Sequence, residues 1–512
     1  MSSNRKIGSI NLHSVLASRI ISACGESPNI LDGIIKARTN ERKIVQRLDS
    51  EFRAQCTGEL GEYLTYEGYE VVSIESELKI KTVSTKETLS VPYRFKFIKK
   101  EFDPKIGDFV YEDKEIIQDI PSPYKKHFMK INGHIYFAMF QLADIIYKTK
   151  DSCVVKTLLT PVKLARPTVG RRKYTSCDGK EIVLEHPYYV LDMLKKPTEF
   201  IKLFFAKMGV PETFEYFGLT GTISFVNVAS IPDRDDVTCF KMNKEVVVCV
   251  SLEALKDKLF CGFLSTLLRI AKRNMTIYDV YNHHYWKCVL GEIFGRPDKS
   301  EEEMKIESCE RTLKILEKTM EDEDTAFHLG LYAGSQGESA DLYAVMRWLF
   351  MNFSKLIHND NLHIKNKRLR LNEYMVIPVI RRFQDRKNNF LKSRDPMKLN
   401  DIFKMSADTL MKEGVENNGV SRYVGLINDN IMLHVLMVTS SGPSAHGGAS
   451  SEKKTRKHTI PTHNLFVHPS HLGVFDTTFA PAGSAGMNQI ITPGVEITSR
   501  GVIKSSIPGD VN

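Results

Sequence analysis

The chain has 512 residues, 42% of them hydrophobic, which is enough for packed cores in roughly three domains of ordinary size and excludes a chain without a folded core. Lys and Arg total 71 against 62 Asp and Glu, so the formal net charge of +9 permits a nucleic-acid partner without requiring one. The strongest apolar stretch, Leu259 to Ala271, contains Thr266 and Arg269 and is too short to cross a bilayer, so we expect no membrane partner.

The cysteines predict free thiols. Nine cysteines occur singly, and no two have the C-x-x-C spacing of a zinc knuckle. An odd number in a long chain is typical of a reducing compartment. The pair His283 and His284 has only Cys288 nearby, which is too few ligands for a tetrahedral site, so we expect no zinc.

The first part of the chain is expected to contain a helical region followed by two blocks of strands. Apolar residues recur at helical spacing up to about Leu60. From Val71 to Phe97 they alternate with polar residues, as in strands with one buried face. A second strand block runs from His127 to about Val162, and within it Asn132-Gly133 predicts a tight hairpin turn.

Between about Lys163 and Lys355 the pattern indicates mixed helix and strand. Ser300, followed by three glutamates, is a capping box and predicts a helix that runs to about Thr319. Another helix is expected from Asp341 through Phe350.

The last part of the chain combines a long helix with a glycine-rich, basic loop. An apolar and basic helix is expected after Tyr374, toward Lys392. Residues 440–451 are rich in Gly, Ser and Ala, which predicts a flexible loop. Four cations follow directly: Lys453, Lys454, Arg456 and Lys457.

A histidine turn near the end of the chain, Val467 to Gly473, is followed by Pro481-Ala482-Gly483 and Gly486-Met487-Asn488. Together these segments resemble the fork region of the β subunits of multisubunit RNA polymerases. In that family a histidine-rich turn precedes a Pro-Glu-Gly-Pro-Asn segment close to the RNA–DNA hybrid. The departures Ala482 and Val474 replace a glutamate and an arginine of the family pattern.

Three further segments match the same family in the same order. Ile131-Asn132-Gly133 with Gln141-Leu142 is similar to the β protrusion strand, and the pattern from Asp341 to Phe350 resembles the end of the β lobe. Asn366-Lys367-Arg368-Leu369-Arg370 resembles the basic run where that chain returns from lobe to protrusion. The chain is therefore similar to the amino-terminal part of a β subunit, in the split form of giant (jumbo) bacteriophages.

This resemblance implies an α+β fold with β-type protrusion and lobe modules followed by a partial fork region. The implied domains are a first part of the protrusion at 1–145, a lobe at 146–355 and a return to the protrusion at 356–435. A fork region is implied at 436–512, ending before the flap and hybrid-binding parts.

The implied activity is DNA-templated RNA synthesis, a nucleotidyl transfer, with this chain as a subunit that carries no catalytic metal. The two Mg²⁺ ions of that reaction need clustered carboxylates, and the chain has no Asp-x-Asp-x-Asp motif. In the family that motif belongs to β′, so Mg²⁺ is expected on a β′-like partner and no residue of this chain is expected to be catalytic. The other implied partners are a C-terminal β-like subunit, a promoter-specificity factor, template DNA and the RNA–DNA hybrid. The implied location is the cytoplasm of an infected bacterium or the virion.

Eight residues are the candidate nucleic-acid contacts: Lys453, Lys454, Arg456, Lys457, His471, Lys367, Arg368 and Arg370. Cations on a flexible loop can follow phosphates without reading bases. The competing interpretation of each charged run is a solvated face. For His468 and His471 it is a histidine pair that fixes a turn through backbone hydrogen bonds.

Two other functions stay open at this point. The first is a polymerase-derived DNA-binding or regulatory protein that works alone and purifies as a stable monomer, whereas a split subunit should need its partners. The second is a metallo-hydrolase that uses His283, His284 and nearby acids, for which the ligand set is incomplete.

Overall fold

The computed structural model describes residues 41–504 with gaps. The stretches of three or more residues left out within these limits are 57–59, 73–87, 104–106, 125–127, 157–160, 167–171, 185–187, 192–196, 271–274, 295–301, 317–322, 332–340, 394–398, 400–405, 414–420, 424–436, 442–467 and 477–487. The chain divides into two compact units, one formed by the residues up to Asp144 together with those from Leu362 onward, and the other by the continuous segment Ile145–Asn361. The second unit is thus inserted in the first. That the two units are a protrusion and a lobe stays a prediction.

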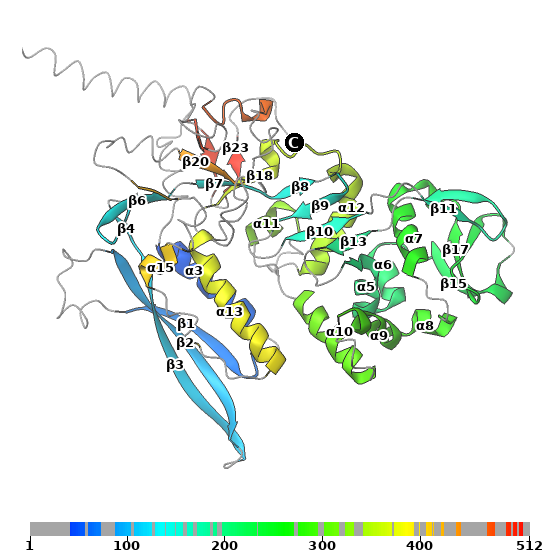
Figure 1. Ribbon diagram of the computed structural model, residues 1–512, viewed down its shortest axis with the longest axis horizontal. Helices are drawn as coiled ribbons and strands as arrows, with labels where there is room; N and C mark the ends of the chain where they lie inside the picture. The colour runs from blue at the N-terminus through cyan, green and yellow to red at the C-terminus, as the bar shows by residue number, and fades with distance from the viewer. Residues whose placement is uncertain are drawn as a thin grey trace, which may run out of the picture. The chain divides into compact units, whose positions relative to one another are not determined.

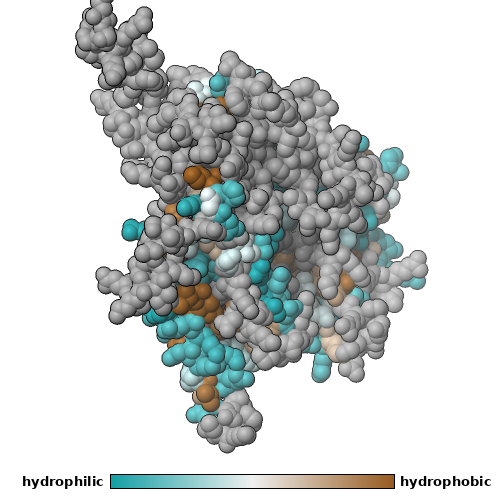
Figure 2. Space-filling view, turned by 60° about the vertical axis from the view of Figure 1, so that its left-hand side comes forward, coloured by the Kyte–Doolittle hydropathy of each residue, from teal (hydrophilic) through white to brown (hydrophobic). Residues whose placement is uncertain are grey.

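A long antiparallel ribbon is the most extended element of the first unit (Figure 1). Its strand order is β1-β2-β3, with β1 at Leu64–Val71, β2 at Ser90–Asp103 and β3 at Asp108–Pro121. The predicted strand pattern is confirmed for the described residues. Figure 2 shows the surface of the ribbon as mostly hydrophilic with hydrophobic patches, and the exposed apolar residues at the start of β3 are Phe109, Val110 and Tyr111.

Two helices pack beside this ribbon, α3 (Glu41–Gln55) and α13 (Glu373–Ser393), and a short third helix, α15 (Ala407–Met411), contacts β3. The side chain of Phe52 on α3 is fully buried, and its ring lies 5.6 Å from Phe95 and 5.2 Å from Phe383. Both long helices were predicted, α3 as the described part of the helical region before Leu60 and α13 as the helix after Tyr374. Their apolar faces meet because each is amphipathic at helical spacing.

A hairpin sheet with strand order β19-β6-β5-β4 follows the ribbon. Its strands are β4 (Pro123–Tyr124), β5 (Phe128–Ile131), β6 (His134–Ala138) and β19 (Ser421–Tyr423). The predicted Asn132-Gly133 turn is confirmed, because it joins β5 to β6 with φ of 48° at Asn132 and 75° at Gly133. These are the positive dihedrals that a tight hairpin needs.

A second four-stranded sheet joins segments that are far apart in the sequence. Its order is β18-β7-β20-β21, from β7 (Phe140–Asp144), β18 (Lys367–Arg370), β20 (Met437–Ser441) and β21 (Asn488–Ile490). Strand β7 pairs antiparallel with β18 and parallel with β20. Every residue of β7 and β18 is buried, so neither strand shows the alternation that marks a half-exposed strand. A small hairpin of β22 (Glu496–Ile497) and β23 (Ile503–Lys504) follows β21 in the sequence.

The second unit has its own core, and its described residues form three sheets. The five-stranded sheet has the order β14-β13-β10-β9-β8, and the smaller ones are β11-β12 and β15-β17-β16. The strand bounds are β8 Ile146–Lys148, β9 Ser152–Val155, β10 Val162–Ala165, β11 Arg172–Thr175, β12 Glu181–Leu184, β13 Tyr189–Leu191, β14 Thr198–Glu199, β15 Ile223–Asn227, β16 Val237–Lys241 and β17 Val246–Ser251. Helix α12 packs on β9 and β10.

Helices fill the rest of this unit. Their bounds are α5 Phe200–Met208, α6 Val210–Tyr216, α7 Lys258–Ile270, α8 Ile277–Tyr281, α9 His283–Phe294, α10 Glu302–Leu316, α11 Glu323–His328 and α12 Leu342–Leu356, with short 3-10 turns η3 Val228–Ser230 and η4 Ala254–Lys256. Helix α5 is apolar around most of its circumference and is accordingly buried in the core. Among the helices that the structure describes, none is long and apolar enough to span a bilayer.

The two predicted helices of this unit are confirmed. The Oδ1 atom of Asp341 accepts a hydrogen bond of 2.8 Å from the Ala344 N–H and caps α12. Helix α10 is described from Glu302 to Leu316, and both Ser300 and the predicted end at Thr319 lie outside the described residues. The mixture of helices and strands in both units is that of an α+β fold.

Candidate nucleic-acid interface

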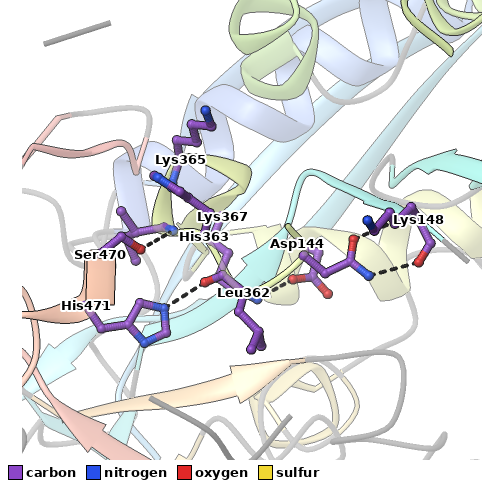
Figure 3. Close-up of polar contacts among 10 residues, drawn as sticks. Asp144, Lys148, Leu362, His363, Lys365, Lys367, Ser470 and His471 are labelled. Atoms are coloured by element: carbon purple, nitrogen blue, oxygen red, sulfur yellow. Dashed lines mark hydrogen bonds and ion pairs between the residues drawn. The ribbon is translucent and has the colours of Figure 1, made fainter. Parts of the chain in front are cut away.

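The histidine turn and the basic strand come together in the first unit. The turn is the short 3-10 helix η8 (Pro469–His471), and it contacts η5 (Ile364–Asn366), which leads directly into β18. Strand β18 in turn pairs with β7, the strand that carries Gln141 and Leu142. Three of the four segments that carried the family resemblance are therefore neighbours in space (Figure 3). The fourth, Asp341 to Phe350, belongs to the second unit.

His468 fixes the turn through hydrogen bonds. Its Nδ1 atom accepts a hydrogen bond of 3.1 Å from the Ser470 N–H and lies 2.7 Å from Ser470 Oγ. The same hydroxyl oxygen accepts a 3.0 Å bond from the Ile364 N–H and so ties the turn to η5 (Figure 3). The turn-fixing interpretation of His468 is confirmed.

His471 is buried and makes the second link. Its Nε2–H donates a 2.8 Å hydrogen bond to the carbonyl oxygen of Leu362, and its ring lies 5.4 Å from that of Phe475. Burial lowers the pKa of His471 to about 4, although the bond to Leu362 acts in the opposite direction. The imidazole is therefore neutral near pH 7 and offers no charge to a phosphate. Lining of a hybrid channel by His471 stays a prediction, and its contacts give it a structural role.

The basic strand β18 is buried as well. Only 9% of the surface of Lys367 is exposed, and its Nζ atom lies 2.6 Å from Oδ1 of Asp144 on β7. Arg368 is fully buried and Arg370 nearly so. An ammonium group that pairs with a buried carboxylate holds two strands together. Phosphate contact by these three residues stays a prediction, and their burial favours a structural role.

A glycine covers the outer edge of β18. The N–H of Leu369 donates a 2.9 Å hydrogen bond to the carbonyl oxygen of Gly501, so this edge of the sheet is paired. Gly501 has φ of +76°, and a Cβ atom there would lie 2.0 Å from the Leu369 oxygen. Only glycine allows this approach.

The exposed side chains near η5 and η8 are not the ones that the sequence suggested as nucleic-acid contacts. Lys365, in the same basic run, is an exposed cation, and Leu472 is an exposed apolar residue of the turn. No pattern in so short a run separates Lys365 from its buried neighbours. The loop cations lie outside the described residues: Lys453, Lys454, Arg456 and Lys457.

The side chains of His283 and His284 in the second unit have different partners. The Nε2 atom of His283 lies 2.6 Å from the carbonyl oxygen of Ala206, which ties this ring to α5. His284 instead faces Glu302 on α10, with its Nε2 atom 3.4 Å from Oε1. A site that uses both histidines as ligands, as the metallo-hydrolase alternative assumed, is not supported.

Comparison with known proteins gives one family. A family model described as "Non-virion RNA polymerase subunit" matches residues 62–502, which include most of both units and the whole histidine turn. No curated protein matches the chain.

Proposed function

Since the chain belongs to the family of non-virion RNA polymerase subunits, we propose that it is the amino-terminal β-like subunit of a split, multisubunit DNA-directed RNA polymerase. As an RNA polymerase subunit it works with other polymerase subunits on DNA and RNA. In this proposal the chain forms one wall of the channel for DNA and the RNA–DNA hybrid. It also supplies a fork loop near the active centre.

The convergence of the β-like segments carries the proposal. Strand β7, the run before and within β18, and the turn η8 are separated by more than a hundred residues in the sequence but share hydrogen bonds in the structure. A chance match to short motifs would not bring them together. The same arrangement fits a protrusion strand that meets a fork turn.

The basic loop is the proposed point of contact with nucleic acid. It leaves the sheet after β20, which ends at Ser441, and the chain returns at His468, the cap of η8. Both ends of the segment are thus held by the first unit, while four cations stand between them. We propose that these cations contact successive phosphates without reading bases.

The chemistry is proposed to reside on other chains. A β′-like partner would hold the Mg²⁺ ions, and a C-terminal β-like subunit would complete the β part. A promoter-specificity factor is a further proposed partner. The name of the family, non-virion, favours the cytoplasm of an infected bacterium as the place of action.

Reconstitution tests the proposal. Co-expression of this chain with the other polymerase subunits of its source should give a complex that synthesises RNA on a DNA template, and omission of this chain should abolish synthesis. The chain alone should synthesise none. A stable monomer that binds DNA and joins no polymerase complex would instead support the stand-alone regulatory alternative.

A charge variant tests the loop. We expect a glutamine variant of the loop cations to lose phosphate contacts; it replaces Lys453, Lys454, Arg456 and Lys457. In a plot of the log affinity of the reconstituted polymerase complex for DNA against log salt concentration, the slope should become shallower by up to about 0.7–0.9 per lost phosphate contact. The charge-matched control replaces four exposed lysines of the second unit, Lys241, Lys244, Lys256 and Lys258. Equal slopes for the loop variant and the unaltered complex would contradict phosphate contact by this loop.

A further inference from the structure

Three groups that can bind a metal meet at one end of the helix pair α9 and α10. His284 and Cys288 are four residues apart on α9 and therefore lie on the same face of that helix. Glu302 is the first residue of α10, which packs against α9. The ligand atoms of the three side chains all lie within 4.8 Å of one another.

The distances within this cluster resemble those of a tetrahedral zinc site. With zinc about 2.0 Å from nitrogen and oxygen and about 2.3 Å from sulfur, tetrahedral angles place N and O about 3.3 Å apart and S and O about 3.5 Å apart. In the structure, His284 Nε2 lies 3.4 Å and Cys288 Sγ lies 3.6 Å from Oε1 of Glu302. The ligand atoms of His284 and Cys288 lie within 4.8 Å of each other.

The backbone beneath the cluster is held in place independently of any ion. At Gly291 the two helices touch, because a Cβ atom there would lie 1.9 Å from the carbonyl oxygen of Lys305. Two ion pairs also cross between the helices, Lys287 with Glu310 at 2.9 Å and Lys305 with Glu292 at 3.2 Å. The ligands therefore stand on a preorganised scaffold, which reduces the conformational cost of binding.

The exposure and chemistry of the cluster define the ion that it suits. The side chain of His284 is 55% exposed and that of Glu302 is 70% exposed, so solvent can reach the site and water can complete the coordination. Thiolate and imidazole ligands select zinc-class divalent ions, whereas Mg²⁺ prefers oxygen ligands alone. The magnesium of nucleotidyl transfer is therefore not the ion expected here.

We propose that His284, Cys288 and Glu302 bind one divalent zinc-class ion, which links the start of α10 to α9 across the connection 295–301. The site is a structural link in the second unit and does not depend on the proposed function of the polymerase. The spacing of His283, His284 and Cys288 predicted no zinc because the third ligand comes from the next helix. Sequence spacing within α9 cannot reveal it.

Metal titration of the purified full chain tests the site. Zn²⁺ added to metal-free protein should bind with a stoichiometry of one at this site and raise the thermal midpoint. The variants His284→Ala, Cys288→Ser and Glu302→Gln should each weaken binding by more than about tenfold. Because these side chains are at the surface, the variants should keep the fold, which circular dichroism can check.

Matched variants separate the site from nonspecific binding. Glu303→Gln changes the next exposed carboxylate of α10, and Cys177→Ser removes an exposed thiol elsewhere, so both should bind as the unaltered chain does. At saturating Co²⁺ a thiolate charge-transfer band should appear in the unaltered chain and both controls and be absent in Cys288→Ser, whereas His284→Ala and Glu302→Gln should need more Co²⁺ to develop it. Absence of binding, or equal binding by all five variants, would overturn the proposal.

Discussion

At the scale of single residues, the neutral imidazole of His471 couples the stability of the first unit to pH. The unfolded chain protonates this ring near pH 6.5, whereas burial lowers the pKa to about 4 in the folded chain. Between these two values the unfolded state binds more protons. The contribution of His471 to the free energy of unfolding is therefore fully present above pH about 6.5. It is lost as the pH falls toward about 4, and the loss is on the order of 3 kcal/mol.

Urea unfolding at a series of pH values measures this effect. The variant His471→Gln should flatten the dependence between pH about 4 and about 6.5, because it removes the titrating group. It should also lower the stability at pH 7 by about 1–3 kcal/mol, since the hydrogen bond to Leu362 is lost in a buried place. A variant with the same pH dependence as the unaltered chain would show that His471 does not titrate in this way.

The ion pair between Lys367 and Asp144 gives a second prediction for a residue. Lys367→Met should lower the free energy of unfolding by about 3–5 kcal/mol, because it leaves a buried carboxylate without its ammonium partner. Lys365→Met, in the same run but exposed, should change it by less than about 0.5 kcal/mol. Chemical denaturation of both variants decides whether the pair is structural.

These contacts explain why the site could be predicted only in part. The family resemblance selected Lys367, Arg368 and Arg370 as one group with His471, and the structure brings them into one region. The charge of the run suggested exposure, but the cations of β18 are buried although it is the first strand of its sheet. Burial depends on partners such as Asp144, which lies 223 positions away in the chain, and no local pattern contains it.

At the scale of elements, the sequence predicted correctly those features that depend on a few neighbouring residues. The Asn132-Gly133 turn and the helix expected from Asp341 were predicted correctly, because each depends on residues close together in the sequence. The sheet β18-β7-β20-β21 was not predicted as a unit, since its strands come from four distant segments and two of them are buried throughout.

The contact of Gly501 with β18 gives a prediction at this scale. Gly501→Ala should destabilise the first unit by at least about 2 kcal/mol more than Gly107→Ala. Both glycines have positive φ, +76° and +72°, so both variants carry the cost of a left-handed alanine, about 1–2 kcal/mol. Only at Gly501 would the added Cβ collide with a backbone oxygen, whereas at Gly107 no atom lies within 4 Å. If thermal unfolding shows the same loss of stability for both variants, β18 can move away from the added Cβ atom without a free-energy cost.

At the scale of the whole molecule, the second unit is a continuous insertion whose ends are tied together. The N–H of Lys148 donates to Oδ1 of Asn361 at 2.8 Å, and Nδ2 of Asn361 donates to the carbonyl oxygen of Lys148 at the same distance. Asn361 thus pairs with the backbone of the edge strand β8, close to both boundaries of the unit.

The fragment 145–361 should therefore fold by itself. We expect a single cooperative thermal transition and native-like circular dichroism for this fragment. Asn361→Ala should lower its free energy of unfolding by about 2 kcal/mol, because two hydrogen bonds at the ends of the unit are lost. A fragment that shows no cooperative transition would contradict an independent core.

The insertion also has a consequence for biosynthesis. A ribosome finishes the segment up to Asn361 long before it makes β20 and β21, whereas β18, at Lys367–Arg370, follows almost at once. The inserted unit can thus reach its native state during translation, while β7 lacks its second neighbour, β20, until residues 437–441 have emerged. Ribosome stalling between β18 and β20 should yield nascent chains in which the inserted unit resists protease while the sheet β18-β7-β20-β21 is still incomplete.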